Sequence, residues 1–356
     1  MILLIRCCAI KNGDNIMQII EILPELDIGG VERHVIDLSN ELVSRGHSVT
    51  VISAGGKMMG QLSESVRHID MPVHKKNPFT IWGCSRKIAA FVRKNKIQIL
   101  HAHSRVPAWI ARWAAKRADI PYIVTAHVDF GNKSPWIYSP YRDAARVICV
   151  SEAVREGMRE CFYDNTQVVL NGLDEPKVRW QVQNQCEPVK FVFVGRLSLV
   201  KGLQDVLMAM PEGVEYDWTL DVLGDGPARK ELESIVKARH FENKVLFHGY
   251  SDKTDEFMAE SSCLLFPSHR EGFGLVLARA AQIGLPILAT DISTTAELAG
   301  SHEGLIPPGN IDKWSTELNN FIKTRKSKVK IPLESIPTMN SMVTAVEDIY
   351  YKALNA

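Results

Sequence analysis

The sequence predicts an α/β protein built from two doubly wound, Rossmann-like domains that face a central cleft. Short apolar, β-rich segments alternate with longer helical patterns, as in parallel sheets covered by helices on both faces. The alternation pauses once, near the middle of the chain, and then resumes. The length of 356 residues also suits two domains of roughly 150 residues each.

The composition excludes several classes of protein. Apolar residues make up 46% and charged residues 23% of the chain, which is typical of a globular protein rather than a disordered one. The formal net charge of +1 argues against a dedicated nucleic-acid-binding protein, which usually carries a basic excess. No segment reaches about 18 consecutive apolar residues, so no membrane-spanning helix is expected.

Residues 17–175 are expected to form the first domain. Residues 30–45 predict a helix because apolar side chains recur on one face, and Gly46 is expected to end it. Strands are expected at 17–23, 48–53, 97–103, 121–127 and 145–151. The preceding residues 1–16 lack the features of a signal peptide, so we interpret them as an N-terminal extension that is either dispensable or the product of a misplaced start.

Residues 190–330 are expected to form the second domain, after a linker at 176–189 that shows no clear period. Its strands are expected at 190–195, 218–224, 244–249, 262–267 and 286–291, and its helices at 201–210, 227–239 and 274–283. Within the C-terminal segment 331–356, apolar residues line one side of a helix at about 340–354. This helix is expected to pack back on the first domain.

Seven cysteines are scattered through the chain without a CxxC pair. Two of them, Cys149 and Cys263, lie in apolar strand-like segments, as small apolar residues do. The pattern predicts reduced thiols, a cytoplasmic location and no structural zinc site.

Candidate functional residues follow the predicted strands, where parallel sheets bind ligands. Gly29 and Gly30 come after the first strand and directly before a helix, so the backbone there can approach a ligand and present free amides to an anion. A plain glycine-containing loop is the alternative interpretation.

Two loops of the second domain carry charged residues. Arg196 and Lys201 bracket the loop after the strand at 190–195, where two cations suit a diphosphate; the alternative is a solvated surface pair. Glu271 lies in a glycine-rich turn before an apolar helix. Its carboxylate can accept hydrogen bonds from sugar hydroxyls, although stabilisation of the helix dipole explains the same position.

Together these segments resemble a known family. The order GGVE, TAH, VVLNGLD, GRLSLVKG, LGDGP and EGFGLVLARA is similar to that of the retaining glycosyltransferases of family 4, which have the GT-B fold. The resemblance covers nearly all of the chain from Met17 onward. The segments GGVERHVIDLSNELVSRGHSVTVISAGG and HAHSRVPAWIARWAA look most like members that extend the lipopolysaccharide core.

The resemblance implies a role for each matching residue. Arg196 and Lys201 match a basic pair that binds the donor diphosphate, and Glu271 matches an acidic residue that contacts the donor sugar. His127 matches a histidine near the reacting sugar, so these four residues are the expected catalytic group. The other matches are the donor-binding residues Gly29, Gly30, Gly272, Phe273, Gly274, Leu275 and Val276, and the hinge-side pair Asn171 and Gly172.

One position departs from the family pattern. The second glutamate of the family motif, which accepts hydrogen bonds from the ribose, is Arg279 here. Arginine has five donors and no acceptor, so it cannot copy that role. Three interpretations stay open: Arg279 binds the donor as a hydrogen-bond donor, it points away while a carboxylate such as Glu297 serves the ribose, or the enzyme is impaired. We favour retained transfer with altered ribose recognition.

The resemblance implies transfer of a sugar from a nucleotide sugar, expected to be UDP-linked, to a hydroxyl of a glycan or lipid-linked acceptor, with retention of configuration. Lipopolysaccharide or another cell-surface polysaccharide is the expected product. Two alternatives stay open: a nucleotide-sugar epimerase of GT-B fold, and a non-catalytic nucleotide-sugar-binding partner, which the arginine at 279 makes plausible.

No metal cofactor is expected. Fixed cations and helix amides can stabilise a departing diphosphate by themselves, and no Asp-x-Asp cluster suits a bridging ion. His101 and His103 lie two apart on a predicted strand, but without a further ligand nearby in sequence they are interpreted as packing residues.

Segment 67–96 is basic, with eight Lys and Arg residues, one acidic residue and several apolar side chains. Such a segment can dock on anionic lipid, which would place the protein at the cytoplasmic face of the inner membrane, next to a lipid-linked acceptor. A solvated helix face is the alternative interpretation.

Overall fold

The structure is a computed structural model that describes residues 16–129, 134, 136–162, 164–181, 188–213 and 217–356. The extension expected at 1–16 therefore falls almost wholly outside the described residues, as do Cys7, Cys8 and Cys186 and most of the second half of the expected linker. The four described cysteines, Cys84, Cys149, Cys161 and Cys263, are buried free thiols.

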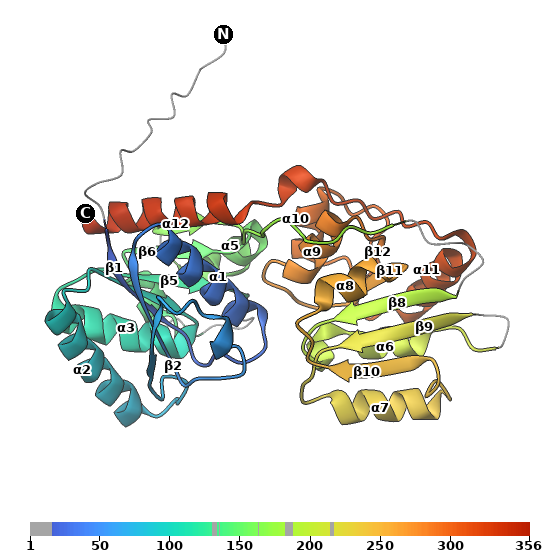
Figure 1. The fold of residues 1–356 in the computed structure, drawn as a ribbon, viewed down its shortest axis with the longest axis horizontal. Coiled ribbons are helices and arrows are strands. Elements are labelled where there is room, and N and C mark those ends of the chain that lie inside the picture. The colour runs from blue at the N-terminus through green and yellow to red at the C-terminus, as the bar shows by residue number, and fades with distance from the viewer. Residues whose placement is uncertain (1–15, 130–133, 135, 163, 182–187, 214–216) are drawn as a thin grey trace, which may run out of the picture.

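The predicted fold class is confirmed, because the described chain forms two parallel sheets with helices on their faces (Figure 1). The strands of the first sheet are β1 (Gln18–Ile22), β2 (Ser48–Ser53), β3 (Arg67–Asp70), β4 (Ile99–His103), β5 (Tyr122–Ala126), β6 (Arg146–Cys149) and β7 (Thr166–Val168). Those of the second are β8 (Val189–Val194), β9 (Trp218–Leu223), β10 (Val245–Gly249), β11 (Cys263–Phe266) and β12 (Ile287–Ala289).

The helices alternate with these strands. Those of the first domain are α1 (Gly30–Ser44), α2 (Pro78–Asn95), α3 (Arg105–Ala118), α4 (Ser139–Arg142) and α5 (Glu152–Gly157). Those that follow are α6 (Leu203–Ala209), α7 (Arg229–Ala238), α8 (Thr254–Ala259), α9 (Leu275–Ile283), α10 (Ser293–Ala299), α11 (Ile311–Thr324) and α12 (Met339–Leu354). None of the described helices is long and apolar enough to cross a membrane.

The order of the strands in each sheet determines where the loops that carry the candidate residues lie. The sheets run β3-β2-β1-β4-β5-β6-β7 and β10-β9-β8-β11-β12, so the order reverses between β1 and β4 and between β8 and β11. Parallel sheets bind ligands at these reversal points, beyond the carboxyl ends of the strands. The loops after β1, β8 and β11 are the ones that carry the candidate residues.

Several elements were not expected from the sequence. The edge strands β3 and β7 have only four and three residues, and none of these residues is fully buried, unlike those of the central strands. Their place is decided by pairing with β2 and β6, which a local pattern does not contain. Helices α8, α10 and α11 were also missed.

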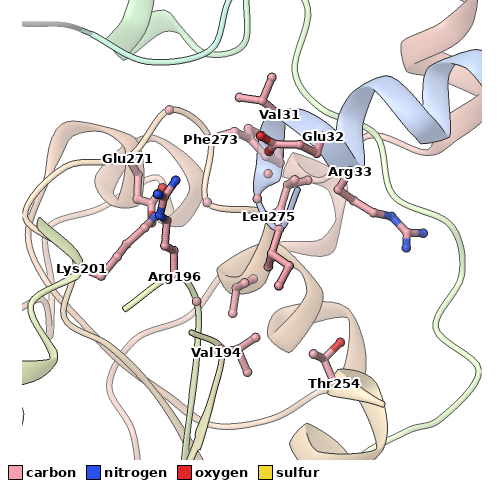
Figure 2. Close-up of a pocket in the computed structure, with 18 of the residues that line it drawn as sticks. Val31, Glu32, Arg33, Val194, Arg196, Lys201, Thr254, Glu271, Phe273 and Leu275 are labelled. Atoms are coloured by element: carbon pink, nitrogen blue, oxygen red, sulfur yellow. The ribbon is translucent and has the colours of Figure 1, made fainter. Parts of the chain in front are cut away.

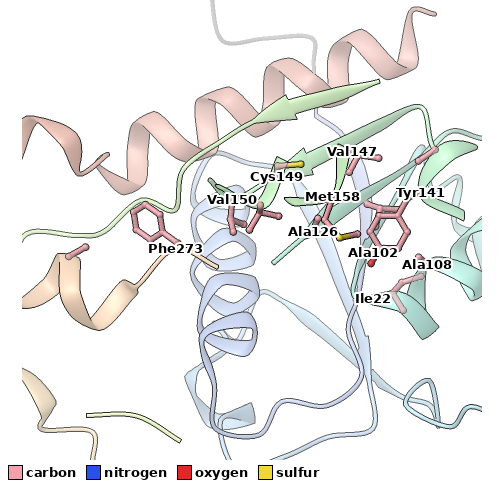
Figure 3. Packing of buried hydrophobic residues seen from close by; sticks show 14 of the residues in the cluster. Ile22, Ala102, Ala108, Ala126, Tyr141, Val147, Cys149, Val150, Met158 and Phe273 are labelled. Atoms are coloured by element: carbon pink, nitrogen blue, oxygen red, sulfur yellow. The ribbon is translucent and has the colours of Figure 1, made fainter. Parts of the chain in front are cut away.

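The apolar core continues from one domain into the other. The largest buried cluster includes Val150, at the end of β6, and Phe273, in the loop before α9. Figure 3 shows the Phe273 ring extending from the second domain toward the Val150 side of the first. Burying this apolar surface between the domains favours a closed cleft.

The C-terminal helix α12 lies along the first domain (Figure 1). Its residues Met342, Val343 and Val346 are buried in one cluster with the apolar side chains of β1 and α1. Glu347 accepts a hydrogen bond from His47 (2.7 Å) and pairs with Arg45, which fixes the helix at its polar edge.

The chain passes between the domains twice, at neighbouring positions. Leu173 forms a parallel bridge with Thr338, and the Leu173 amide donates to the Pro337 carbonyl (3.0 Å). A Cβ on Gly172 would lie 2.4 Å from the Thr338 carbonyl oxygen, so only glycine allows this close approach. Asn171 and Gly172 thus lie at the crossing between the domains.

Candidate active site

A cavity of about 800 Å³ opens between the two domains. It is lined from both sides, by the loop after β1 in the first domain and by the loops after β8 and β11 in the second. The expected site residues that line it are Gly29, Gly30, His127, Asn171, Arg196, Lys201, Glu271, Gly272, Phe273, Gly274, Leu275 and Val276. Residues from distant parts of the sequence are thus gathered around one space.

Lys201 and Glu271 form an ion pair on the second-domain wall, and Ser268 donates a hydrogen bond to the same carboxylate oxygen (3.0 Å). The pair depends on Gly202, whose φ of 70° is left-handed and whose Cβ position lies 1.9 Å from the Pro267 carbonyl oxygen. Any larger residue would separate the two loops. In Figure 2, Arg196 lies beside this pair.

Arg196 is exposed in the cavity and has no ion-pair partner within hydrogen-bond distance among the described residues. Across from it, the carboxyl of Glu32 lies at the start of α1, where burial raises its pKa while the charge of Arg196 opposes the increase. The Glu32 carboxylate also folds over Gly29, 2.3 Å from where a Cβ would be. The expected anion site at Gly29–Gly30 therefore already has a carboxylate beside it, which the sequence interpretation did not include.

The loops of the two domains touch at Gly272. A Cβ on this residue would lie 1.7 Å from the His127 carbonyl oxygen, and the Gly272 carbonyl accepts a hydrogen bond from Ser151 (2.7 Å). The loop after β11 is thereby held against the ends of β5 and β6. Glu271 and His127 consequently belong to one site.

His127 lies at the surface end of a buried polar cluster. Its Nε2 is 3.0 Å from Nδ1 of His103, and Nε2 of His103 is 2.7 Å from the carboxylate of Glu21. Tyr350, on α12, donates to the other oxygen of that carboxylate (2.8 Å). His101 completes the cluster between Tyr350 (2.6 Å) and Thr125 (2.7 Å).

The electrostatics favour the neutral form of the His34, His103 and His127 imidazoles near the carboxylate of Glu21. Burial lowers the pKa of His103 to about 4 and of His34 to about 3, and holds that of His127 well below its usual value; neighbouring histidines act in the same direction. Burial alone would raise the pKa of Glu21, but His101 and His103 together hold it well below the usual range.

Sequence reasoning treated His101 and His103 as packing residues because their partners are remote in sequence. The structure brings His34, His103 and His127 together, and likewise Glu21, His101 and His103, with ligand atoms within 4.8 Å in each group. Imidazole and carboxylate are the donors that bind zinc. The expectation of a metal-free reaction remains a prediction.

Arg279 is not among the residues that line the cavity. Its guanidinium donates to the Asp174 carbonyl (2.7 Å) and lies 3.6 Å from the carboxylate of Asp255. Of the three interpretations of this residue, the structure favours the one in which it points away. Glu297 does not line the cavity either: its two oxygens accept hydrogen bonds from the backbone amides of Glu152 (2.8 Å) and Ala153 (2.9 Å).

Another part of the cavity wall was missed entirely. Tyr250, Ser251, Asp252 and Thr254 line it after β10, and the Tyr250 hydroxyl accepts a hydrogen bond from Gln61 of the first domain (3.0 Å). The signal that could have found them is their place after a strand of the same parallel sheet.

Comparison with known proteins supplies the family. The family model described as Glycosyltransferase Family 4 matches residues 28–176, and the family model described as Glycosyl transferases group 1 matches residues 174–332. The chain belongs to the family 4 type of glycosyltransferases. This glycosyltransferase is 26% identical over 322 residues to glycogen synthase of Mycobacterium tuberculosis, covering 77% of each chain.

Solved structures agree on the GT-B fold. The glycosyltransferase superposes on HepE from Anabaena, solved in complex with UDP and glucose, with a TM-score of 0.78, 17% identity and coverage of 94% and 100% of the two chains. It superposes on the lipopolysaccharide outer core galactosyltransferase WaaB with a TM-score of 0.64, 18% identity and coverage of 95% and 98%.

Proposed function

We propose that this glycosyltransferase transfers a sugar from a UDP-linked donor to a hydroxyl of a glycan or lipid-linked acceptor, with retention of configuration. The observation that carries the proposal is the charged wall of the cavity, where Arg196 and the Lys201–Glu271 pair lie side by side at the reversal point of the second sheet. The complex of HepE with UDP and glucose supports the choice of donor.

In this proposal the two cations act on the leaving group. As the bond between the anomeric carbon and the phosphate oxygen breaks, Arg196 and Lys201 stabilise the charge that develops on the diphosphate. The acceptor oxygen bonds to the anomeric carbon from the same face, and its proton passes to the departing phosphate oxygen. Glu271 accepts hydrogen bonds from hydroxyls of the donor sugar. No step requires a metal ion.

The charge-neutral double variant Arg196→Gln/Lys201→Gln tests the proposal. Each lost charged hydrogen bond costs about 1.5–3 kcal/mol, so UDP affinity in calorimetry should fall at least 100-fold. Hydrolysis of UDP-glucose should be lost with it. Lys230→Gln removes an exposed cation from α7 and serves as the control. Unchanged UDP affinity in the double variant would overturn the proposal, and an isomerised sugar nucleotide among the products would show an epimerase instead.

We further propose that α2 brings the enzyme to a membrane that carries its acceptor, as a step in lipopolysaccharide or related cell-envelope synthesis. The eight basic residues of segment 67–96 are all exposed, as are Phe79 (84%) and Trp82 (46%) at the start of α2. Arg86 stacks on the Trp82 ring (4.7 Å). Each cation near anionic lipid contributes about 1 kcal/mol, and exposed rings add apolar burial. The likeness to the fold of WaaB is compatible with this role.

Vesicle flotation tests the membrane proposal. The protein should float with phosphatidylglycerol-containing vesicles at low salt and remain behind with neutral ones, because the attraction is electrostatic. Phe79→Ser/Trp82→Ser should weaken flotation, whereas Leu333→Ser, which removes an exposed apolar side chain elsewhere (55% exposed), should not. Absence of flotation at low salt would exclude this contact.

A further inference from the structure

A buried polar cluster lies behind His127, and the role that we infer for it rests on the proposed function. Strands β1, β4 and β5 are neighbours in the first sheet, and each contributes a polar side chain at or just after its carboxyl end: Glu21, His103 and His127. Glu21 and His103 are fully buried, where an unpaired polar group would be costly. Each link of the chain is of hydrogen-bond length, at 2.7 and 3.0 Å.

The direction of these hydrogen bonds follows from the acceptor at the inner end. An ionised carboxylate only accepts, and Glu21 faces three donors: the Tyr350 hydroxyl (2.8 Å), Nε2 of His103 (2.7 Å) and Nδ1 of His101 (3.1 Å). His103 therefore carries its proton on Nε2. A neutral imidazole has one N–H, which leaves Nδ1 of His103 as an acceptor.

The same rule then applies to the outer ring. Since Nδ1 of His103 accepts, Nε2 of His127 must donate to it, and Nδ1 of His127 carries no proton. No residue that the structure describes hydrogen-bonds to this Nδ1, while the His127 side chain lines the cavity. His34, whose ring centroid lies 5.0 Å from that of His127, is also uncharged at neutral pH, because burial lowers its pKa to about 3.

We propose that Glu21 and His103 are positioning residues that fix His127 in the neutral form protonated on Nε2, so that its Nδ1 accepts a hydrogen bond from a hydroxyl of the transferred sugar. His127 then orients the sugar and does not act as a general acid. Helix α12 contributes to this arrangement, because the Tyr350 hydroxyl donates a hydrogen bond to the second oxygen of Glu21.

The first test reads the tautomer directly in the ligand-free protein. Long-range proton–nitrogen NMR on ¹⁵N-histidine-labelled enzyme, with His127 assigned by its loss in His127→Asn, should show a proton on Nε2 and none on Nδ1 at neutral pH. A proton on Nδ1, or an imidazolium, would overturn the proposal. So would stoichiometric zinc in the purified protein at His34, His103 and His127, because the metal would replace the Nε2 proton.

The second test separates positioning from packing. His103→Leu removes the Nδ1 acceptor for His127, whereas in His103→Asn the side-chain amide oxygen can occupy the position of Nδ1 and accept the same hydrogen bond. Turnover of UDP-glucose should fall about 10- to 100-fold in the leucine variant and recover partly in the asparagine variant, with UDP affinity unchanged in both. Equal losses in the two variants would show a packing role and overturn the proposal.

Glu21→Gln and Thr125→Val complete the design. An amide offers both a donor and an acceptor. Glu21→Gln should therefore allow the hydrogen bonds from residue 21 through His103 to His127 to run in either direction, and it should give two sets of His127 signals. Thr125→Val removes an equally buried hydroxyl that bonds to His101 (2.7 Å) and should keep the single His127 form. A single unaltered His127 form in Glu21→Gln would overturn the role of Glu21. If UDP affinity did not depend on Arg196 and Lys201, the proposed function would be refuted, whereas the inferred tautomer of His127 would be unaffected.

Discussion

The backbone of Gly272 lies directly against that of His127, so close that a Cβ on Gly272 would come within 1.7 Å of the His127 carbonyl oxygen. This contact joins two loops, one from each domain, that line the cavity. The hydrogen bond from Ser151 to the Gly272 carbonyl (2.7 Å) lies beside it. The distance between Glu271 and His127 is therefore set by a position that only glycine can occupy.

Gly272→Ala should separate the two loops and misplace the donor sugar. A displacement of about 1 Å at a reacting centre costs on the order of 100-fold in rate, so hydrolysis of UDP-glucose should fall by about that factor. UDP affinity should change much less. Gly83→Ala is the matched control. Gly83 lies on α2, and a Cβ added there would meet no atom within 4 Å, so the turnover of this variant should equal that of the parent enzyme.

Glu271→Gln should separate sugar recognition from diphosphate binding. The substitution keeps the shape of the side chain but removes the charge that pairs with Lys201. The freed cation should bind UDP as tightly as before or more tightly, while turnover of UDP-glucose should fall at least tenfold, as expected for a lost charged hydrogen bond of about 1.5–3 kcal/mol. Calorimetry with UDP and a hydrolysis assay measure the two effects. A parallel loss of both would mean that Glu271 supports the loop rather than the sugar.

Arg279→Met should weaken folding more than donor binding. The guanidinium joins α9 to the interdomain segment at Asp174 and faces Asp255, and only 15% of its side chain is exposed. Its loss should reduce the free energy of unfolding by about 1–3 kcal/mol, the cost of leaving partly buried polar partners unpaired. Denaturant unfolding measures this effect and UDP calorimetry provides the comparison. A tenfold loss of UDP affinity with unchanged stability would return Arg279 to the donor site.

Stability should fall as the pH drops below about 6.5. The folded-state pKa values of His103 (about 4) and His34 (about 3) are lower than the value of 6.5 for a free histidine. Between these pH values the unfolded chain binds protons that the folded chain excludes. Each such histidine therefore lowers the free energy of unfolding by up to about 1.4 kcal/mol for each pH unit below 6.5. The stability is fully present only above pH 6.5.

Urea unfolding at a series of pH values tests this dependence. His34→Gln should flatten the slope between pH 6.5 and 4, whereas His240→Asn, which removes an exposed histidine, should leave it unchanged. A stability that does not vary over this range would contradict the burial of neutral imidazoles in the folded protein.

The sequence by itself determined the fold class and the loops after β1, β8 and β11 that line the cavity. Central strands such as β8 and β11 are short, mostly apolar segments. The charged or glycine-rich loops around Lys201 and Glu271 follow them directly, so a local pattern suffices to find these loops. Because parallel strands share one carboxyl edge, residues after separate strands could be assigned to one cleft before their distances were known.

Only the tertiary structure decided the direction of Arg279, the use of Glu297 as a partner for backbone amides, and the Glu21–His103–His127 chain. Each depends on contacts between residues 24 to 145 positions apart, and a side chain's partner at such separations is a property of packing rather than of periodicity. His103 illustrates the difference: in the sequence it is a histidine on a buried strand with no partner nearby, and the sheet makes it the link between a buried carboxylate and the proposed sugar site.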